Sequence, residues 1–257
     1  LREQSPGDGQ RRYIERLREY FAGHDLVHIT HRKVNLAAWH LYPDARPATR
    51  NRQARSPVKA VLNYWADWHG TSAPRIKMEP ETPSPVAVAS LYVEENLLNA
   101  MPGSSLKMEK SALIIALFRQ GWRITEALGL QWSNVDLLAG TVQLYVGKVN
   151  QWVTMPLHPK FQEALRQMYC QGCGVNRSVF PWTNRNQVYD WLKPLRIKAN
   201  TPSFTPHMAR RNFATRANDA GFSTLDIKAA GSWTSTKSIE RYVHVDMNRA
   251  KKVMRVI

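Results

Sequence analysis

Residues 141–157 read Thr141-Val-Gln-Leu-Tyr-Val-Gly-Lys-Val-Asn-Gln-Trp-Val-Thr-Met-Pro-Leu157. Apolar and polar side chains alternate on both sides of the stretch from Gly147 to Gln151, and a period of two residues is typical of a half-buried strand. The stretch therefore predicts two short strands joined by a turn. Lys148 lies at the tip or at a strand end, where its long side chain can reach into a cleft.

The rest of the chain has the period of helices. Apolar residues recur at helical spacing near the N-terminus, after Ser56-Pro57, and on both sides of a predicted turn at Gly121. Helices are predicted over residues 13–21, 58–65, 108–130 with the turn inside it, 161–169, 186–195, 208–220 and from 239 onward. We therefore expect a mainly α protein with a small β-sheet, an α+β fold.

A proline-rich segment divides the chain. Residues 74–85 contain four prolines and few apolar residues, which predicts a linker. We expect a small helical domain over residues 1–80 and a larger domain over residues 81–257. The chain begins at Leu1 rather than at Met, which is compatible with a fragment that lacks an upstream domain.

The composition is strongly basic. Thirty-six Lys and Arg against 20 Asp and Glu give a net charge of +16, which indicates a polyanionic partner such as DNA, RNA or an anionic membrane. Residues 191–218 carry six basic residues and no acidic one. No run of about 18 apolar residues and no signal-peptide pattern is present, so we expect a cytoplasmic protein without membrane contact.

Neither the cysteines nor the histidines predict a metal site. Cys170 and Cys173 form a single Cys-x-x-Cys pair, whereas structural zinc needs four ligands. His24, His28 and His31 are closely spaced but have no carboxylate or cysteine motif beside them. A metal or redox role is the less favoured alternative for both groups, and we expect no metal and no cofactor.

A set of polar residues spread over half the chain points to phosphodiester chemistry: Arg123, Lys148, His207, Arg210 and Tyr242. Phenol has a pKa of about 10, so a nucleophilic tyrosine needs a site built around it. Two guanidiniums can hold the oxygens of a phosphate and stabilise the charge that develops in the transition state. His207 and Arg210 stand three residues apart at a predicted helix start, where amide dipoles also favour phosphate.

The order of these motifs carries a resemblance. Gly121-Trp-Arg123-Ile-Thr-Glu126, the Lys148 hairpin, Pro206-His207-Met-Ala-Arg210 and Arg241-Tyr242 occur in the order and spacing of the tyrosine recombinases. Over about residues 110–250 the chain resembles phage-type integrases of that family, and residues 48–68 look like their helical core-binding domain. The resemblance implies a core-type DNA-binding domain over residues 1–80 and a recombinase catalytic domain over residues 81–257.

The resemblance also implies a role for each catalytic residue. Arg123 and Arg210 would clamp the scissile phosphate, and Tyr242 would attack it. Lys148 would protonate the leaving 5′-oxygen, and His207 would exchange a proton with the tyrosine.

Two further positions, and two departures from the family pattern, bear on the site. Trp233 stands where the family carries His or, less often, Trp; indole donates one hydrogen bond but cannot exchange protons, so we expect positioning and packing. Glu126 would hold an arginine or the helix start. Ser232 stands where glycine is usual, and Arg211 where histidine is common.

Basic residues outside the catalytic set are candidates for DNA backbone contacts: Arg50, Arg52, Arg55, Lys59 and Arg211. A polar helix face is the alternative reading of the first three.

We therefore expect a site-specific DNA recombinase, the integrase of a phage or other mobile element, that works through a 3′-phosphotyrosine without ATP or metal. Its expected partners are double-stranded DNA, three further copies in a homotetramer, and accessory DNA-bending proteins, at the nucleoid of a bacterial cytoplasm. The alternatives are a type IB topoisomerase-like enzyme and a catalytically idle DNA-binding relic of an integrase.

Overall fold

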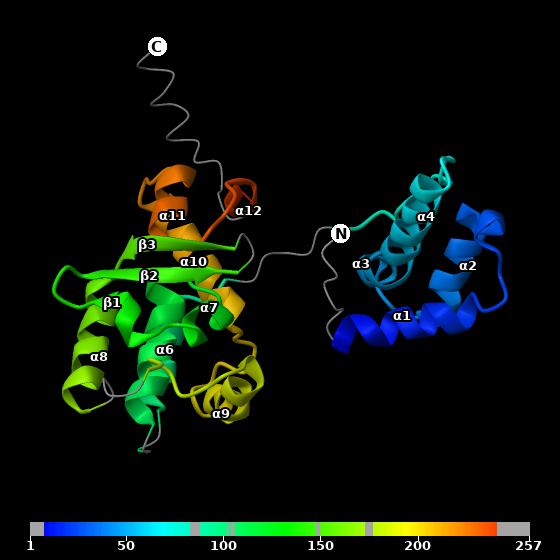
Figure 1. Cartoon of the computed structure of the whole chain (residues 1–257). Coiled ribbons are helices and arrows are strands. Elements are labelled where there is room, and N and C mark those ends of the chain that lie inside the picture. Colours follow the sequence, from blue (N-terminus) through cyan, green and yellow to red (C-terminus); the bar gives the residue numbers. More distant parts are fainter. Residues whose placement is uncertain are drawn as a thin grey trace, which may run out of the picture. The chain divides into compact units, whose positions relative to one another are not determined.

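The computed structural model describes residues 8–82, 88–101, 103, 106–147, 150–172 and 177–240. The chain divides into two compact units, Leu1–Pro85 and Val86–Ile257 (Figure 1). The division falls five residues after the expected end of the first domain at residue 80. Both units are built mainly from helices and the second also contains a three-stranded sheet, which confirms the α+β prediction.

The N-terminal unit is a bundle of short helices. Its elements are α1 (Asp8–Tyr20), η1 (Leu26–His28), α2 (His31–Leu41), α3 (Pro47–Arg50), the π-helix η2 (Asn51–Arg55) and α4 (Ser56–Trp68). α3, η2 and α4 follow one another without a break, so the helix predicted at Ser56-Pro57 begins earlier than expected. The core is formed by small and branched side chains from several helices: Leu17, Val34, Ala38, Ala54, Val58 and Leu62.

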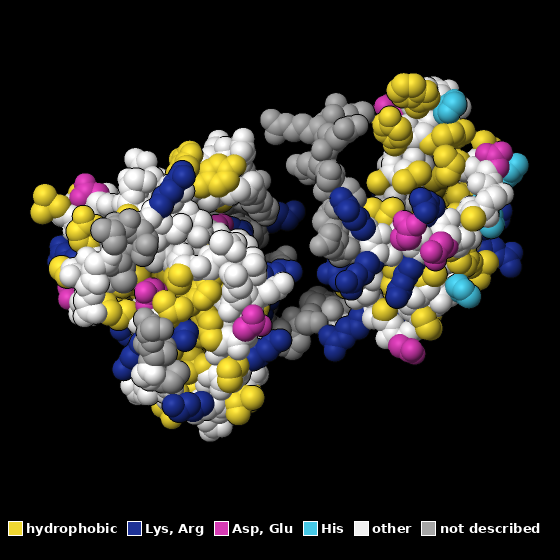
Figure 2. Space-filling view, turned by 60° about the horizontal axis from the view of Figure 1, so that its bottom comes forward, with side chains coloured by type: hydrophobic (Ala, Val, Ile, Leu, Met, Phe, Trp, Pro, Cys, Tyr) yellow, Lys and Arg dark blue, Asp and Glu magenta, His cyan; other side chains and the backbone are white. Residues whose placement is uncertain are grey.

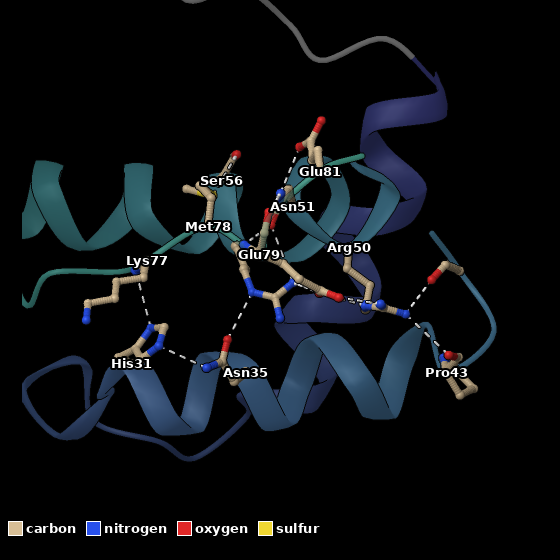
Figure 3. Close-up of polar contacts among 12 residues, drawn as sticks. His31, Asn35, Pro43, Arg50, Asn51, Ser56, Lys77, Met78, Glu79 and Glu81 are labelled. Atoms are coloured by element: carbon tan, nitrogen blue, oxygen red, sulfur yellow. Dashed lines mark hydrogen bonds and ion pairs between the residues drawn. The ribbon is translucent and has the colours of Figure 1, made fainter. Parts of the chain in front are cut away.

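The segment after α4 packs on the N-terminal unit although it is neither helix nor strand. Ile76 is buried in the core of this unit. Glu79 forms an ion pair with Arg50 (Figure 3). It forms a second ion pair with Arg55. The first part of the expected linker at residues 74–85 is therefore fixed to the helices that precede it.

The C-terminal unit contains one sheet and eight α-helices within the described residues. Its elements are α5 (Leu91–Asn99), α6 (Lys107–Arg119), α7 (Ile124–Leu128), η3 (Trp132–Asn134), β1 (Val135–Asp136), β2 (Thr141–Val146), β3 (Gln151–Pro156), α8 (Pro159–Cys170), α9 (Arg185–Lys198), α10 (Pro206–Asp219), α11 (Thr224–Ala230) and α12 (Lys237–Glu240). The predicted hairpin is confirmed, since β2 and β3 pair antiparallel with Leu144 opposite Val153. No helix in the described residues is both long and apolar enough to cross a membrane.

Helix α6 organises the C-terminal core. Its residues 112–118 are all buried, because the helix packs against α5, α8 and α10. Figure 1 shows α8 and α10 beside it. A helix that is apolar all round belongs to the interior of a domain. The chain leaves α6 through Gly121, whose φ of +63° lies in the left-handed region that favours glycine. This turn sends the next residues back toward α10.

Candidate active site

Arg123 lies at the start of α7, directly after the Gly121 turn. Trp122 is fully buried and its Nε1 lies 3.1 Å from the sulfur of Met155 on β3, which fixes the chain at this point. The Glu126 carboxylate accepts the Arg123 backbone N–H at 2.8 Å and its Nη1 at 2.5 Å. Glu126 thus holds both the helix start and the arginine, which confirms the two roles considered for it.

Arg210 lies in α10 and is buried. Its Nη1 donates to the Gly121 carbonyl at 2.5 Å and to the Ser232 hydroxyl at 2.6 Å, and its Nη2 donates to the Ser232 carbonyl at 3.1 Å. Both Nη1 hydrogens are therefore engaged. Only 3% of the Arg210 side chain is exposed, against 30% of that of Arg123.

The side chain of Trp233 packs against Arg210 at this site. Its ring lies 3.8 Å from the Arg210 guanidinium carbon and stacks on Phe213 at 5.6 Å between centroids. The close approach depends on Gly231, because a Cβ there would lie 2.1 Å from Cζ3 of Trp233. The indole therefore packs on the Arg210 guanidinium, and its positioning role in the reaction stays a prediction.

Three segments that are distant in the sequence thus meet at one point. They are the Gly121–Glu126 turn, Arg210 of α10, and the loop between α11 and α12. The two guanidiniums share one carboxylate, with Arg210 Nη1 3.7 Å from Glu126 Oε2. Two guanidiniums therefore lie beside one carboxylate, in a largely buried place where charge interactions are strong. Such a centre suits an anionic ligand.

The contacts of the arginine cluster given above do not include the other three predicted catalytic residues, His207, Lys148 and Tyr242. His207 lies at the exposed N-terminal turn of α10, one helical turn before the buried Arg210. Lys148 and Tyr242 lie outside the described residues. β2 ends at Val146, two residues before Lys148, β3 begins at Gln151, and α12 ends at Glu240, two residues before Tyr242.

Two of the arginines assigned to DNA contacts are buried in the N-terminal unit. Arg50 Nη2 lies 2.5 Å from Glu79 Oε1 (Figure 3). Arg55 Nη1 lies 2.9 Å from Glu79 Oε2. The hydrogen bond from Arg50 lowers the pKa of Glu79 and raises that of the arginine. These two guanidiniums hold the unit together, whereas Arg52 and Lys59 are exposed.

Sequence reasoning missed three residues of these clusters. Ser232 was noted as a departure from glycine, but its bonds to both arginines and Glu126 were not foreseen. Gly231 and Glu79 carried no signal of their own. The described residues bring no group of three His, Cys, Asp or Glu together that could hold a metal.

Two solved structures of integrases have the same fold as this chain. The integrase of transposon Tn1549 in complex with transposon right end DNA gives a TM-score of 0.76 at 15% identity, covering 99% of this chain and 95% of that one. A lambda integrase tetramer bound to a Holliday junction gives a TM-score of 0.69 at 14% identity, covering 94% and 73%. The chain therefore has the fold of these integrases.

The sequence comparison gives the family. The model of the phage integrase family matches residues 92–249. The chain belongs to this family. Tyrosine recombinase XerC of Xylella fastidiosa is 26% identical over 156 residues, which is 58% of this chain and about half, 52%, of the relative. Tyrosine recombinase XerD of Halalkalibacterium halodurans is 24% identical over 267 aligned residues, covering 97% of this chain and 89% of the relative.

Proposed function

We propose that the chain cuts and rejoins double-stranded DNA at a specific site through a covalent bond to Tyr242. The observation that carries this proposal is the meeting of Arg123 and Arg210 around one carboxylate, in a family of recombinases. Two arginines held in fixed orientation can neutralise a phosphate as its phosphorus becomes five-coordinate. The hydrogen bonds that hold the two guanidiniums in place keep the free-energy cost of orienting them toward the phosphate low.

The reaction conserves the energy of the phosphodiester bond. The Tyr242 oxygen forms a bond to phosphorus while the bond from phosphorus to the 5′-oxygen breaks. His207 accepts the phenolic proton, and Lys148 supplies a proton to the departing 5′-oxygen. A 5′-hydroxyl from another strand then attacks the phosphotyrosine and reverses the step, so the reaction needs neither ATP nor a metal.

The arginines would approach the phosphate differently. Arg123 is the more exposed of the two and would make the first contact. Both Nη1 hydrogens of Arg210 are engaged within the protein, and its Nη2 donates to the Ser232 carbonyl, so these contacts fix the plane of the guanidinium that would meet the phosphate. Arg210 is nearly closed off from solvent, so the side chains that cover it must shift when DNA binds.

Backbone contacts outside the site would come from the exposed basic residues. Figure 2 shows Lys and Arg side chains on the visible faces of both units. Arg52 and Lys59 of the N-terminal unit and the half-buried Arg211 of the C-terminal unit remain candidates. We assign Arg50 and Arg55 to the interior, where Glu79 holds them.

We further propose that the protein works as a homotetramer on DNA, with accessory DNA-bending proteins, at the nucleoid of a bacterial cytoplasm. The support for the tetramer is the likeness to the lambda integrase, whose tetramer is bound to a Holliday junction. The support for a mobile-element source is the likeness to the Tn1549 transposon integrase.

The test is capture of the covalent intermediate. The protein is incubated with labelled duplexes from the ends of the element that carries its gene, quenched in denaturant, and separated by gel electrophoresis. The parent should form an adduct that Tyr242→Phe does not form, although Tyr242→Phe should bind the same DNA about equally well. No adduct from the parent would favour a DNA-binding relic, and relaxation of any supercoiled plasmid without a specific site would favour a topoisomerase.

The role of Lys148 has its own test. Lys148→Ala should cleave ordinary DNA slowly, because an alkoxide is a poor leaving group. A bridging 5′-sulfur, which leaves as a thiolate of pKa about 8.5, should restore cleavage by this variant. The same substitution should leave Arg210→Ala impaired. Equal rescue of both variants would remove Lys148 from the role of general acid.

A further inference from the structure

Ser232 occupies the centre of the charged cluster. Its side-chain hydroxyl donates a hydrogen bond to Glu126 Oε2 at 2.6 Å and accepts one from Arg210 Nη1 at 2.6 Å. The residue is 2% exposed, so both bonds form out of contact with solvent. The partners lie 106 and 22 residues away in the sequence, so this is a purely tertiary arrangement.

The backbone of the same residue completes the arrangement. The Ser232 carbonyl accepts Arg123 Nη1 at 3.3 Å and Arg210 Nη2 at 3.1 Å. Ser232 therefore contacts both guanidiniums and the carboxylate between them. The carbonyl contacts are available to any residue at this position, whereas the two hydroxyl contacts need a side chain that donates and accepts at once.

The distances show what the hydroxyl does. Arg210 Nη1 and Glu126 Oε2 are 3.7 Å apart, which is too long for a hydrogen bond, and the Ser232 oxygen bridges them. Without the hydroxyl, the buried Nη1 loses an acceptor and the carboxylate loses a donor. Opposite charges at this distance would then close into a direct ion pair. That closure would turn the Arg210 guanidinium toward Glu126.

We propose that Ser232 is a positioning residue, which holds Arg210 at a fixed distance from Glu126 and so fixes its orientation toward the scissile phosphate. The inference rests on the proposed function and adds a residue to its site. Glycine, the usual residue at this place in the family pattern, has no hydroxyl. The bridge is therefore a feature of this chain, and it makes the Arg210 geometry depend on a side chain outside the set of catalytic residues.

The first experiment compares Ser232→Ala with the parent in single-turnover adduct formation on the duplex that the parent cleaves. The cleavage rate should fall by about ten- to a hundredfold, as expected for the loss of a hydrogen bond to a charged group. DNA affinity should change by less than about threefold, because the charges remain. Ser232→Thr keeps the hydroxyl and should recover most of the rate. Ser133→Ala, at an exposed serine of η3, is the matched control and should cleave like the parent.

A double-mutant cycle separates positioning from folding. Lysine at position 210 has no Nη1, so Ser232→Ala should lower the cleavage rate of Arg210→Lys by less than about threefold. Thermal unfolding of each variant shows whether it is folded, and Ser232→Gly replaces Ser232→Ala if the latter does not fold. Equal losses from Ser232→Ala in both backgrounds, or a parental rate in Ser232→Ala, would overturn the inference while the proposed function stands. A parent that forms no adduct would overturn the proposed function, and this inference with it.

Discussion

Gly231→Ala should disturb the site through a steric clash alone. The φ of Gly231 is −118°, which any residue adopts, so backbone strain plays no part. The added Cβ would lie 2.1 Å from Cζ3 and 2.4 Å from Cε3 of Trp233, whose side chain is packed between Phe213 and Arg210. Carbon atoms in contact need about 3.5–4.0 Å, so the indole has to move by more than 1 Å.

The expected cost has two parts. Forcing an extra methyl into a packed interior costs about 1–3 kcal/mol of unfolding free energy. For a unit of this size that corresponds to a fall in Tm of about 2–4 °C for each kcal/mol. Displacing the indole also removes its contact with the Arg210 guanidinium, worth about 0.5–2 kcal/mol, and frees the arginine to change orientation. We therefore expect cleavage to fall by about ten- to a hundredfold, while DNA affinity stays within about threefold of the parent.

The measurements are a calorimetric melt, a DNA titration and single-turnover adduct formation. Gly129→Ala is the matched control. A Cβ at Gly129 would meet its nearest neighbours, two carbonyl oxygens, at 3.6 Å, an ordinary contact, and the φ there is −80°. If Gly231→Ala and Gly129→Ala melted at the same temperature and cleaved at the same rate, the packing of Trp233 against the arginine would have no bearing on the reaction.

Three further predictions concern the supports of the two units. Glu79→Gln should speed hydrogen exchange in the N-terminal unit. The Arg50 guanidinium lowers the pKa of Glu79, so the contribution of the Glu79 carboxylate to stability is present above about pH 4.3 and is lost as the pH falls through the lowered pKa. The N-terminal unit of the parent should therefore also exchange faster in acid than its stability at neutral pH predicts. Glu94→Gln should lower the free energy of unfolding, measured in urea, by about 2–4 kcal/mol. The Glu94 carboxylate is 0% exposed and pairs with Arg119 at 2.8 Å and with Lys160 at 3.1 Å. Arg52→Ala should reduce the slope of log affinity against log salt by about 0.9 if this exposed arginine contacts one phosphate, and an unchanged slope would remove it from the DNA surface.

The regular elements were predictable because their signals are local. The helix at Ser56-Pro57 and the strands around Gly147 follow from periodicity within a few residues, and the structure confirms them. The strand β1 and the helices α5 and α11 were missed, because two to nine residues contain too few periods to stand out.

The site was predictable only in part. The resemblance identified Arg123 and Arg210 as a pair, and the structure brings them together. The residue that contacts both of them is Ser232, 109 residues beyond Arg123, and no local pattern encodes that pairing. The same limit applies to Arg50, whose partner Glu79 is 29 residues further along the chain. The sequence shows that a residue is charged, but whether that residue is buried depends on the distant residue that packs against it.

The long sequence separation within the arginine cluster has a consequence for biosynthesis. Closing a contact between Arg123 and the carbonyl of Ser232 requires nearly the whole C-terminal unit to have been made, and such contacts form late. The hydrophobic core of the N-terminal unit is formed by residues of that unit, so it can fold while translation continues. A nascent chain on the ribosome should therefore contain a folded N-terminal unit for many seconds before the arginine cluster assembles, and we expect it to be unable to break DNA during that time.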